Sequence, residues 1–234
     1  LYRAVCYLNK LLLKLGFAID GGKDSLSMSA KYNQRTIRSP NQFVLTSYVM
    51  TEDFNETATP FFKKAGNSII YVDLGYSQYR IGGSAICQVL NKFEYEVPTF
   101  NNVKNFKKIF KVIQNLIEKN HIVSCHDRSD GGFITALLEM SFAGNIGINV
   151  NIESDVDLYN FMFSEELGLI IETPYPHAVI DKLKDIVPTY RIGKITENNQ
   201  IKIKFNDIEI IKENVADLRN VWEEKSSELE EHQC

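Results

Sequence analysis

The sequence has few of the residues that mark secreted, zinc-binding or nucleic-acid-binding proteins. Its 234 residues include four cysteines, six prolines and one tryptophan. Cys6, Cys87, Cys125 and Cys234 are scattered and form no C-x-x-C pair, which indicates free thiols in a reducing compartment rather than a disulfide framework or a zinc site. With 26 basic and 30 acidic side chains the net charge is −4, so a nucleic-acid partner is not expected.

Long apolar segments are also missing. No run approaches the roughly 18 residues that a membrane-spanning helix needs, and the first residues lack the basic-then-apolar pattern of a signal peptide. We therefore expect a cytoplasmic protein with no membrane partner. The apolar fraction of 44% and the charged fraction of 24% are ordinary for a globular protein, and the length suffices for one large domain or two small ones.

Periodicity predicts an α+β fold. Apolar residues at helical spacing indicate a helix over residues 1–15 that Gly16 ends, and the chain opens inside this helix. Strands are expected at 26–31 and 42–51, followed by a polar linker at 51–60. Beyond it we expect strands at 68–73, 122–125, 147–152, 167–172, 190–195 and 200–210, and helices at 85–90, 103–119, 131–143, 156–163, 178–186 and 213–230. Some of the predicted strands follow one another along the chain without a helix between them, which argues against a purely parallel doubly wound sheet.

The most informative segment is residues 125–132, which reads Cys-His-Asp-Arg-Ser-Asp-Gly-Gly and lies between a predicted strand and a predicted helix. Such a turn presents backbone N–H groups and the positive end of a helix dipole, so it can hold phosphate oxygens, and its carboxylates can hold a divalent metal. The alternative is local structure only. Asp130 would then cap the helix, and Asp127 and Arg128 would form a solvated pair.

Three weaker segments could also carry chemistry. Residues 20–25 form a glycine-rich turn with a lysine, but the P-loop pattern fails because Phe17 replaces the first glycine and Asp24 replaces the Ser/Thr. Residues 82–84, Gly-Gly-Ser, fit either close helix–strand packing or a phosphate contact. Glu165 and Glu166 could act as an acid pair, although a solvated loop before a strand is the reading we favour.

A cysteine nucleophile is not supported. Cys125 and His126 are adjacent on an extended strand and therefore point to opposite faces. The other histidines, His121, His177 and His232, complete no triad pattern and no metal spacing.

Taken in order, these segments resemble one enzyme family. The resemblance rests on six internal motifs and on the tail from Leu218 to Ser226, which is similar to the segment that follows the family's synthetase core. The motifs are Gly22-Lys23-Asp24-Ser25-Leu26-Ser27-Met28, Ser39-Pro40, Gly82-Gly83-Ser84-Ala85, His126-Asp127-Arg128-Ser129-Asp130-Gly131-Gly132, Glu139-Met140-Ser141-Phe142-Ala143-Gly144 and Glu165-Glu166-Leu167-Gly168. Their order and spacing resemble phosphoribosylformylglycinamidine synthase, the glutamine amidotransferase of purine biosynthesis, over essentially the whole chain.

The resemblance implies an ATP-dependent ligase that converts formylglycinamide ribonucleotide and glutamine-derived ammonia into formylglycinamidine ribonucleotide. It implies two pseudo-symmetric synthetase halves, each built like aminoimidazole ribonucleotide synthetase. Residues 1–56 would end the second A-type domain, residues 57–210 would form the second B-type domain, and residues 211–234 would lead towards a glutaminase domain of the same polypeptide.

The resemblance also implies roles for particular residues. Asp127 matches a Mg²⁺ ligand and Ser129 a nucleotide contact, in a pocket that holds ADP. Gly22, Lys23, Asp24 and Ser25 match the loop that faces the substrate and ATP. No catalytic residue is assigned, because the family's catalytic histidine and further metal ligands match nothing between Leu1 and Cys234.

We expect the chain by itself to be inactive and to bind nucleotide poorly, since one carboxylate does not make a near-octahedral Mg²⁺ site. The alternative is a free-standing nucleotide- or sugar-phosphate-binding module of the same superfamily. A kinase-type relative is less consistent with the sequence, because such relatives lack the Gly-Lys-Asp-Ser loop of residues 22–25 and the Trp-Glu-Glu tail of residues 222–224.

Overall fold

A computed structural model of the chain describes residues 1–39, 42–51, 53, 55–100 and 102–231. Pro40, His232 and Cys234, which figure in the sequence predictions, lie outside these residues. The chain divides into two compact units, Leu1–Phe54 and Asn55–Cys234. Each unit is described by itself.

The first unit begins with the predicted helix, α1 (Tyr2–Leu15). Gly16 ends it in the left-handed conformation, with φ of 91°, and its N–H donates to the carbonyls of Leu12 and Leu13. Glycine adopts this conformation without the Cβ penalty of other residues. The prediction of the helix and of its stop is confirmed.

A two-stranded antiparallel hairpin follows, β1 (Ser29–Tyr32) and β2 (Arg35–Arg38). The predicted strand at 26–31 therefore exists but starts at Ser29, and the second strand was missed. Asn33 makes the tight turn, with φ of 53°. The predicted strand at 42–51 is wrong, because these residues are irregular and none of the described strands pairs with them. β-Branched and aromatic residues favour strands by packing on a pleated, half-buried surface, and Tyr48, Val49 and Met50 are exposed.

The second unit is built on a seven-stranded sheet with strand order β4-β6-β3-β7-β5-β8-β9. Neighbouring strands are antiparallel except for the parallel pair β5 and β8. The mixed sheet confirms the α+β prediction. The strands are β3 (Ser68–Asp73), β4 (Ser124–Asp127), β5 (Gly147–Ile152), β6 (Gly168–Thr173), β7 (Thr189–Thr196), β8 (Gln200–Phe205) and β9 (Ile208–Asn214). The single strand predicted at 200–210 is in fact β8 and β9, because Asn206 and Asp207 turn the chain with positive φ.

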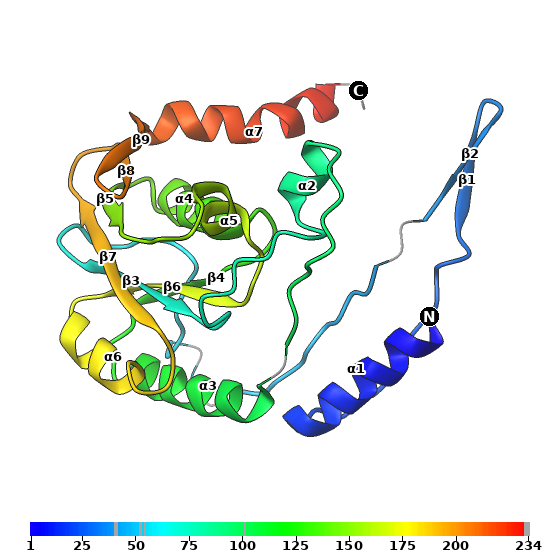
Figure 1. Ribbon diagram of the computed structural model, residues 1–234, viewed down its shortest axis with the longest axis horizontal. Helices are drawn as coiled ribbons and strands as arrows, with labels where there is room; N and C mark the ends of the chain where they lie inside the picture. The colour runs from blue at the N-terminus through cyan, green and yellow to red at the C-terminus, as the bar shows by residue number, and fades with distance from the viewer. Residues whose placement is uncertain (40–41, 52, 54, 101, 232–234) are drawn as a thin grey trace. The chain divides into compact units, whose positions relative to one another are not determined.

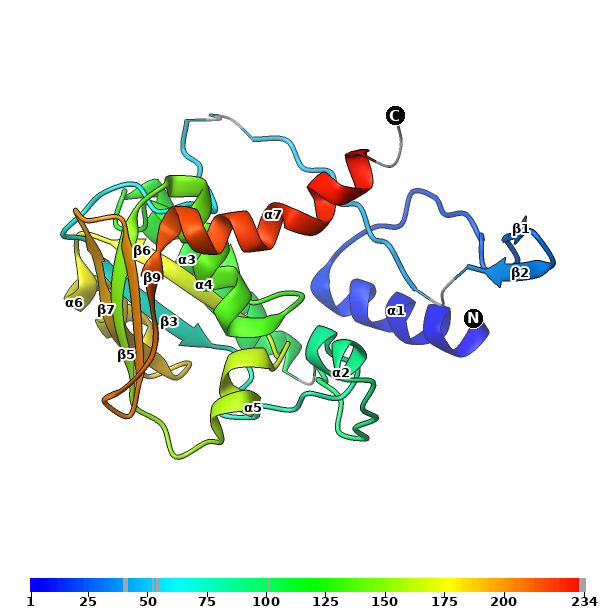
Figure 2. The same cartoon turned by 90° about the horizontal axis from the view of Figure 1, so that it is seen from above.

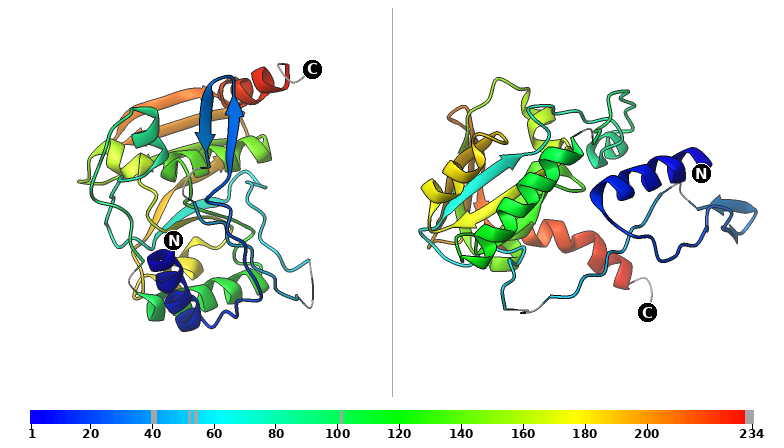
Figure 3. Two further views of the ribbon diagram at one scale, coloured as in Figure 1. Left: turned by 90° about the vertical axis from the view of Figure 1, so that its right-hand side faces the viewer. Right: turned by 90° about the horizontal axis from the view of Figure 1, so that it is seen from below.

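Helices cover both faces of this sheet (Figures 1 and 3). Side chains of α4 and α5 pack on one face, and those of α3 and α6 on the other. The helices of this unit are α2 (Ala85–Val89), α3 (Val103–Glu118), α4 (Gly132–Gly144), α5 (Leu158–Phe163), α6 (Pro176–Leu183) and α7 (Val215–Glu231). All six match predicted helices, with ends that differ by a few residues.

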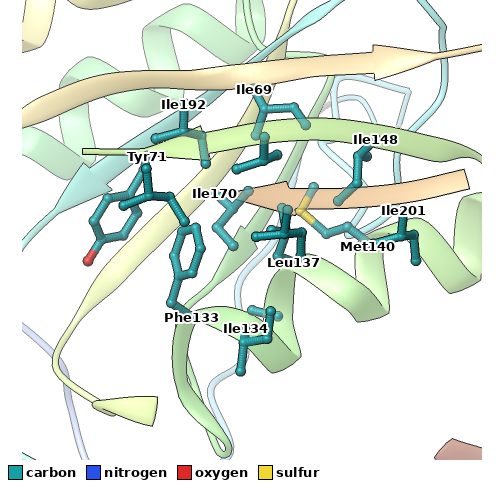
Figure 4. Close-up of a cluster of buried hydrophobic side chains, with 14 of the residues drawn as sticks. Ile69, Tyr71, Phe133, Ile134, Leu137, Met140, Ile148, Ile170, Ile192 and Ile201 are labelled. Carbon is teal, nitrogen blue, oxygen red and sulfur yellow. The ribbon is translucent and has the colours of Figure 1, made fainter. Parts of the chain in front are cut away.

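The central strand β3 contributes to two separate cores. Its Ile69 and Tyr71 side chains join the cluster under α4 and α5, whereas Ile70 and Val72 join the cluster under α3 and α6. Alternate side chains of a strand point to opposite faces, so a strand covered on both sides is apolar throughout. Figure 4 shows Tyr71 beside Phe133 of α4, whose rings meet edge to face at 5.0 Å.

The last helix, α7, packs beside α4 (Figure 2), where the rings of Phe142 and Trp222 lie 6.1 Å apart. Val215, its first residue, is fully buried in the α4 and α5 core. Among the described residues, no helix is both long enough and apolar enough to cross a membrane.

Candidate functional site

The motif at residues 125–132 lies where the sequence placed it, between a strand and a helix. β4 ends at Asp127, residues 128–131 form the loop, and α4 begins at Gly132. Within the loop, the Gly132 N–H donates to the Ser129 carbonyl at 2.9 Å. Ser129 itself is exposed just before the N-terminus of α4.

The two glycines allow this loop to turn sharply into the helix. Gly131 and Gly132 have φ of 81° and 77°. A Cβ on Gly132 would lie 2.7 Å from the Met162 carbonyl oxygen, so the helix start is seated directly on the end of α5. The predicted cap is wrong. Gly131 is the N-cap residue, no side chain caps the helix from that position, and Asp130 is exposed.

Arg128 is buried, so the solvated Asp127–Arg128 pair is also wrong. Its side chain reaches back to β3, where one guanidinium nitrogen lies 3.6 Å from a carboxylate oxygen of Asp73 and another donates to the Tyr71 hydroxyl. It further donates to the carbonyls of Glu166 and of Leu167, the latter at 3.2 Å. A buried charge is tolerated when it is paired and hydrogen-bonded in this way.

Asp73 is the fully buried partner of Arg128 and was missed in the sequence. Its carboxylate accepts hydrogen bonds from the backbone N–H groups of Gly75 and Ser77, at 3.1 and 2.7 Å. Tyr79 donates its hydroxyl to the same carboxylate at 3.3 Å, and burial raises the pKa of Tyr79 above its ordinary value. A charged residue that ends a largely apolar strand, two residues before a glycine, was the signal available in the sequence.

Glu165 and Glu166 are not in a solvated loop. One oxygen of Glu165 accepts from the backbone N–H groups of Ala85 and Gly131, at 2.8 and 2.9 Å. Glu166 is buried and forms an ion pair with the guanidinium of Arg80. The segment therefore joins the predicted Gly82-Gly83-Ser84 turn to the loop after β4.

Asp127 is exposed at the end of β4 and interacts with His126, whose Nδ1 lies 3.4 Å from its carboxylate. This interaction lowers the pKa of Asp127 and raises the pKa of His126. The other ring nitrogen of His126 lies 3.4 Å from the Glu139 carboxylate on α4.

These groups do not complete a magnesium site. Within the described part of the chain, no three His, Cys, Asp or Glu side chains gather in a way that could hold a metal ion. Asp127 offers one exposed carboxylate, and Mg²⁺ requires near-octahedral oxygen coordination.

The environment of Cys125 supports the prediction that this cysteine is not a nucleophile. It packs against the apolar cluster under α3 and α6, and burial raises the pKa of its thiol to about 12. A thiol at such a pKa stays protonated at neutral pH and is inert.

The Gly22–Ser25 loop belongs to the first unit and is held by local contacts. The Lys23 ammonium donates to the Ser25 hydroxyl at 2.6 Å, and the Leu26 N–H donates to the Asp24 carboxylate at 2.9 Å. A Cβ on Gly22 would meet nothing within 4 Å, so the backbone there is open to approach.

A cavity of about 800 Å³ lies next to the Arg80–Glu166 ion pair. Its walls come from residues 77–81, from residues 94–99 and from Val156 and Asn160. Both basic and acidic side chains line it, including Arg80, Glu94 and Glu96. No sequence pattern indicated this cavity, because its walls come from three segments that are separate along the chain.

Comparison with known proteins places these motifs in a family context. The chain is 38% identical to a probable phosphoribosylformylglycinamidine synthase, chloroplastic/mitochondrial, of Arabidopsis thaliana over 100% of its length. It is 34% identical to the phosphoribosylformylglycinamidine synthase of Homo sapiens over 96%, and 37% identical to that of Dictyostelium discoideum over 98%. The chain spans only 17 to 19% of the length of these relatives.

Solved structures share the fold. Thermotoga maritima PurL complexed with ATP matches 70% of this chain with a TM-score of 0.55 at 14% identity, and the match covers 27% of that protein. The same PurL complexed with FGAR gives a TM-score of 0.56 over 70% of this chain and 30% of that protein. The model of the AIR synthase related protein, C-terminal domain, matches residues 64–206, so this chain belongs to the AIR synthase related protein family.

Proposed function

We propose that this chain is part of a phosphoribosylformylglycinamidine synthase. That enzyme is the ATP-dependent ligase that makes formylglycinamidine ribonucleotide from formylglycinamide ribonucleotide and glutamine-derived ammonia. The observation that carries the proposal is the identity of 34 to 38% to three proteins of that name along 96 to 100% of the chain. All the motifs lie inside the match to the Arabidopsis relative, because that match covers the whole chain.

The domain assignment is part of the same proposal. Residues 1–56 would end the second A-type domain, residues 57–210 would form the second B-type domain, and residues 211–234 would lead towards the glutaminase domain. The family match at 64–206 and the compact unit that starts at Asn55 support it. The cytoplasm stays the predicted location, although the Arabidopsis relative is named as an organellar protein.

We assign nucleotide contact to Ser129 and to the loop in front of α4. An exposed hydroxyl next to a helix N-terminus suits a phosphate group, because the start of a helix carries a partial positive charge and N–H groups that have no partner inside the helix. PurL of Thermotoga maritima, which shares the fold, was solved in complex with ATP, ADP and AMPPCP.

Asp127 is proposed as a single carboxylate ligand for Mg²⁺. The described residues leave the remaining positions to phosphate oxygens, water or other parts of the polypeptide. A magnesium ion there would neutralise phosphate charge, and Asp127 is suited to it because its lowered pKa keeps it ionised well below neutral pH.

The loop of residues 22–25 is proposed to face the substrate and ATP. Lys23 supplies a compact positive charge, and the open backbone at Gly22 permits close approach of an anion. Phosphoryl transfer needs positioning and charge neutralisation more than covalent chemistry, so these groups would bind and orient rather than react.

The test uses the complete polypeptide that carries this chain. We expect ATP hydrolysis that depends on both formylglycinamide ribonucleotide and glutamine. ATP turnover without that dependence would overturn the ligase proposal and favour the free-standing nucleotide-binding module.

The site residues are tested by ADP binding in the presence of Mg²⁺. Asp127→Asn and Ser129→Ala are each expected to weaken binding by about tenfold, since charge-assisted contacts contribute roughly 1.5–3 kcal/mol. Asp155→Asn, at an exposed position outside the motif of residues 125–132, is the matched control. Unchanged affinity in both variants would show that the residue assignment is wrong. The chain by itself is expected to bind Mg-ADP poorly, and micromolar binding in a calorimetric titration would contradict that expectation.

A further inference from the structure

Residues 164–167 contact two loops that are far apart in the sequence. One loop, residues 80–85, lies before and at the start of α2, and the other, residues 128–131, lies between β4 and α4. The Ser164 hydroxyl donates to the Arg80 carbonyl at 2.9 Å, and the carbonyls of Glu166 and Leu167 accept from the Arg128 guanidinium. One short segment therefore fixes both loops.

Glu165 makes the most direct link between them. A single carboxylate oxygen accepts from the N–H of Ala85, the first residue of α2, and from the N–H of Gly131, the N-cap residue of α4. The first N–H groups of a helix have no partner inside the helix, and a negative charge is favoured beside them. Glu165 thus satisfies one such donor on each of two helices.

Glu166, the next residue, is anchored in the interior. It pairs with Arg80, and its carboxylate side chain is 3% exposed. A Cβ on Gly75 would lie 2.9 Å from the Cβ of Glu166, so the backbone of the loop after β3 is packed against it. These contacts leave the chain around Glu165 little freedom to move away from the two helix starts.

We propose that Glu165 is a positioning residue for the nucleotide site. It holds the start of α4 at a fixed place relative to the Gly82-Gly83-Ser84 turn, and so sets where Ser129 presents its hydroxyl and the loop its N–H groups. The inference rests on the function proposed above, and it names a residue that acts through the loop and does not itself touch the nucleotide.

Glu165 is suited to positioning more than to stability. It is half-buried, and its carboxylate contacts two backbone donors and no cation among the hydrogen bonds and ion pairs of the described residues. Glu165 belongs to neither of the two apolar clusters, so its substitution opens no core cavity. Substitution of Glu165 is therefore expected to make the two loops less ordered and to leave the folded state as a whole intact.

The test compares Glu165→Gln and Glu165→Ala in the complete polypeptide, with Glu153→Ala as the control at an exposed position. Glutamine keeps an acceptor oxygen at the same reach, whereas alanine removes it. We expect Glu165→Ala to weaken ADP binding by at least about tenfold, as removal of supporting groups commonly does, and Glu165→Gln to restore affinity to within about threefold of the wild type. Amide hydrogen exchange at Ala85 and Gly131 should rise in the alanine variant only.

The outcomes separate this inference from the proposed function. A wild-type polypeptide that does not bind ADP overturns the nucleotide site itself, and the inference with it. Wild-type affinity in Glu165→Ala overturns the inference and leaves the nucleotide site intact. Equal loss in the glutamine and alanine variants, without rescue, also overturns it, because the acceptor oxygen would then not be the operating group.

Discussion

Glu172 offers the sharpest test of how the second unit is held together. It lies on β6, is fully buried, and accepts four hydrogen bonds from residues that the structure describes, all of them neutral donors. One oxygen accepts from the Lys64 N–H and the Asn67 side chain, at 3.0 and 2.7 Å. The other accepts from the Lys63 N–H at 2.7 Å and the Ser124 hydroxyl at 3.1 Å. The carboxylate thereby ties residues 63–67 to the sheet.

The perturbation is Glu172→Gln, which keeps the volume and removes the charge. Glutamine replaces one acceptor oxygen by an NH₂ donor. The Ser124 hydroxyl can rotate to accept from that NH₂, but the Lys63 N–H would face a donor and lose its partner. An unsatisfied buried N–H costs about 1–3 kcal/mol, and the remaining bonds lose their charge assistance, so we expect a loss of about 2–4 kcal/mol in the free energy of unfolding.

The assay is urea unfolding of the chain, with Glu153→Gln as the control at an exposed position. The control should lie within about 0.5 kcal/mol of the wild type. A loss below about 1 kcal/mol in Glu172→Gln would refute the reasoning, because it would mean that the four bonds contribute no more than a single neutral hydrogen bond.

Three further predictions concern the core and the loop. Gly132→Ala should lower the free energy of unfolding by about 2 kcal/mol or more, because the new Cβ would collide with the Met162 carbonyl and φ is 77°. The control is Gly83→Ala, where φ is 79° but a Cβ would meet nothing, so this variant measures the backbone strain alone. Phe133→Ala should cost about 3–5 kcal/mol in urea unfolding, and a loss under 1 kcal/mol would contradict its place in the core. Cys125 should resist alkylation at pH 8 in the folded chain and react after unfolding. Because its folded pKa is raised to about 12, its contribution to stability should be complete below about pH 8.5 and fall as the pH rises towards 12, measured against Cys125→Ala.

The periodicity of apolar residues was sufficient to predict the helices and strands that bury one face or both faces. The helical spacing of Ile109, Ile113 and Leu116 places them in the core under α3, and the apolar run at 68–73 is the fully buried strand β3. The failure at residues 42–51 shows the limit of that reasoning. A segment with high strand propensity forms a strand only where a partner strand and a packed face are available, and the sequence of the segment shows neither.

The charged residues of the site were harder to interpret. Asp127 and Ser129 stood out because the motif around them is dense, yet Glu165 and Glu166 were wrongly read as a solvated loop, and the alternative reading of Arg128 as part of a solvated pair is also wrong. The partners of these three side chains, Asp73 and Arg80 among them, lie from 34 to 86 residues away along the sequence. Without knowledge of which strands are neighbours, a buried ion pair and a solvated charge look the same in a sequence.

The apolar character of β3 on both faces has a consequence for how the sheet chooses its pairing. A strand that alternates apolar and polar residues is penalised when it slips by one position, but Ile69, Ile70, Tyr71 and Val72 are acceptable on either face. The free-energy penalty for a slipped register of β3 comes instead from charged residues near the ends of β3 and β6. Asp73 pairs with Gly168 in register beside Arg128, and Ile69 pairs with Glu172. A slip would bury both acids away from their donors, so two carboxylates select one register among several that the apolar side chains alone would accept.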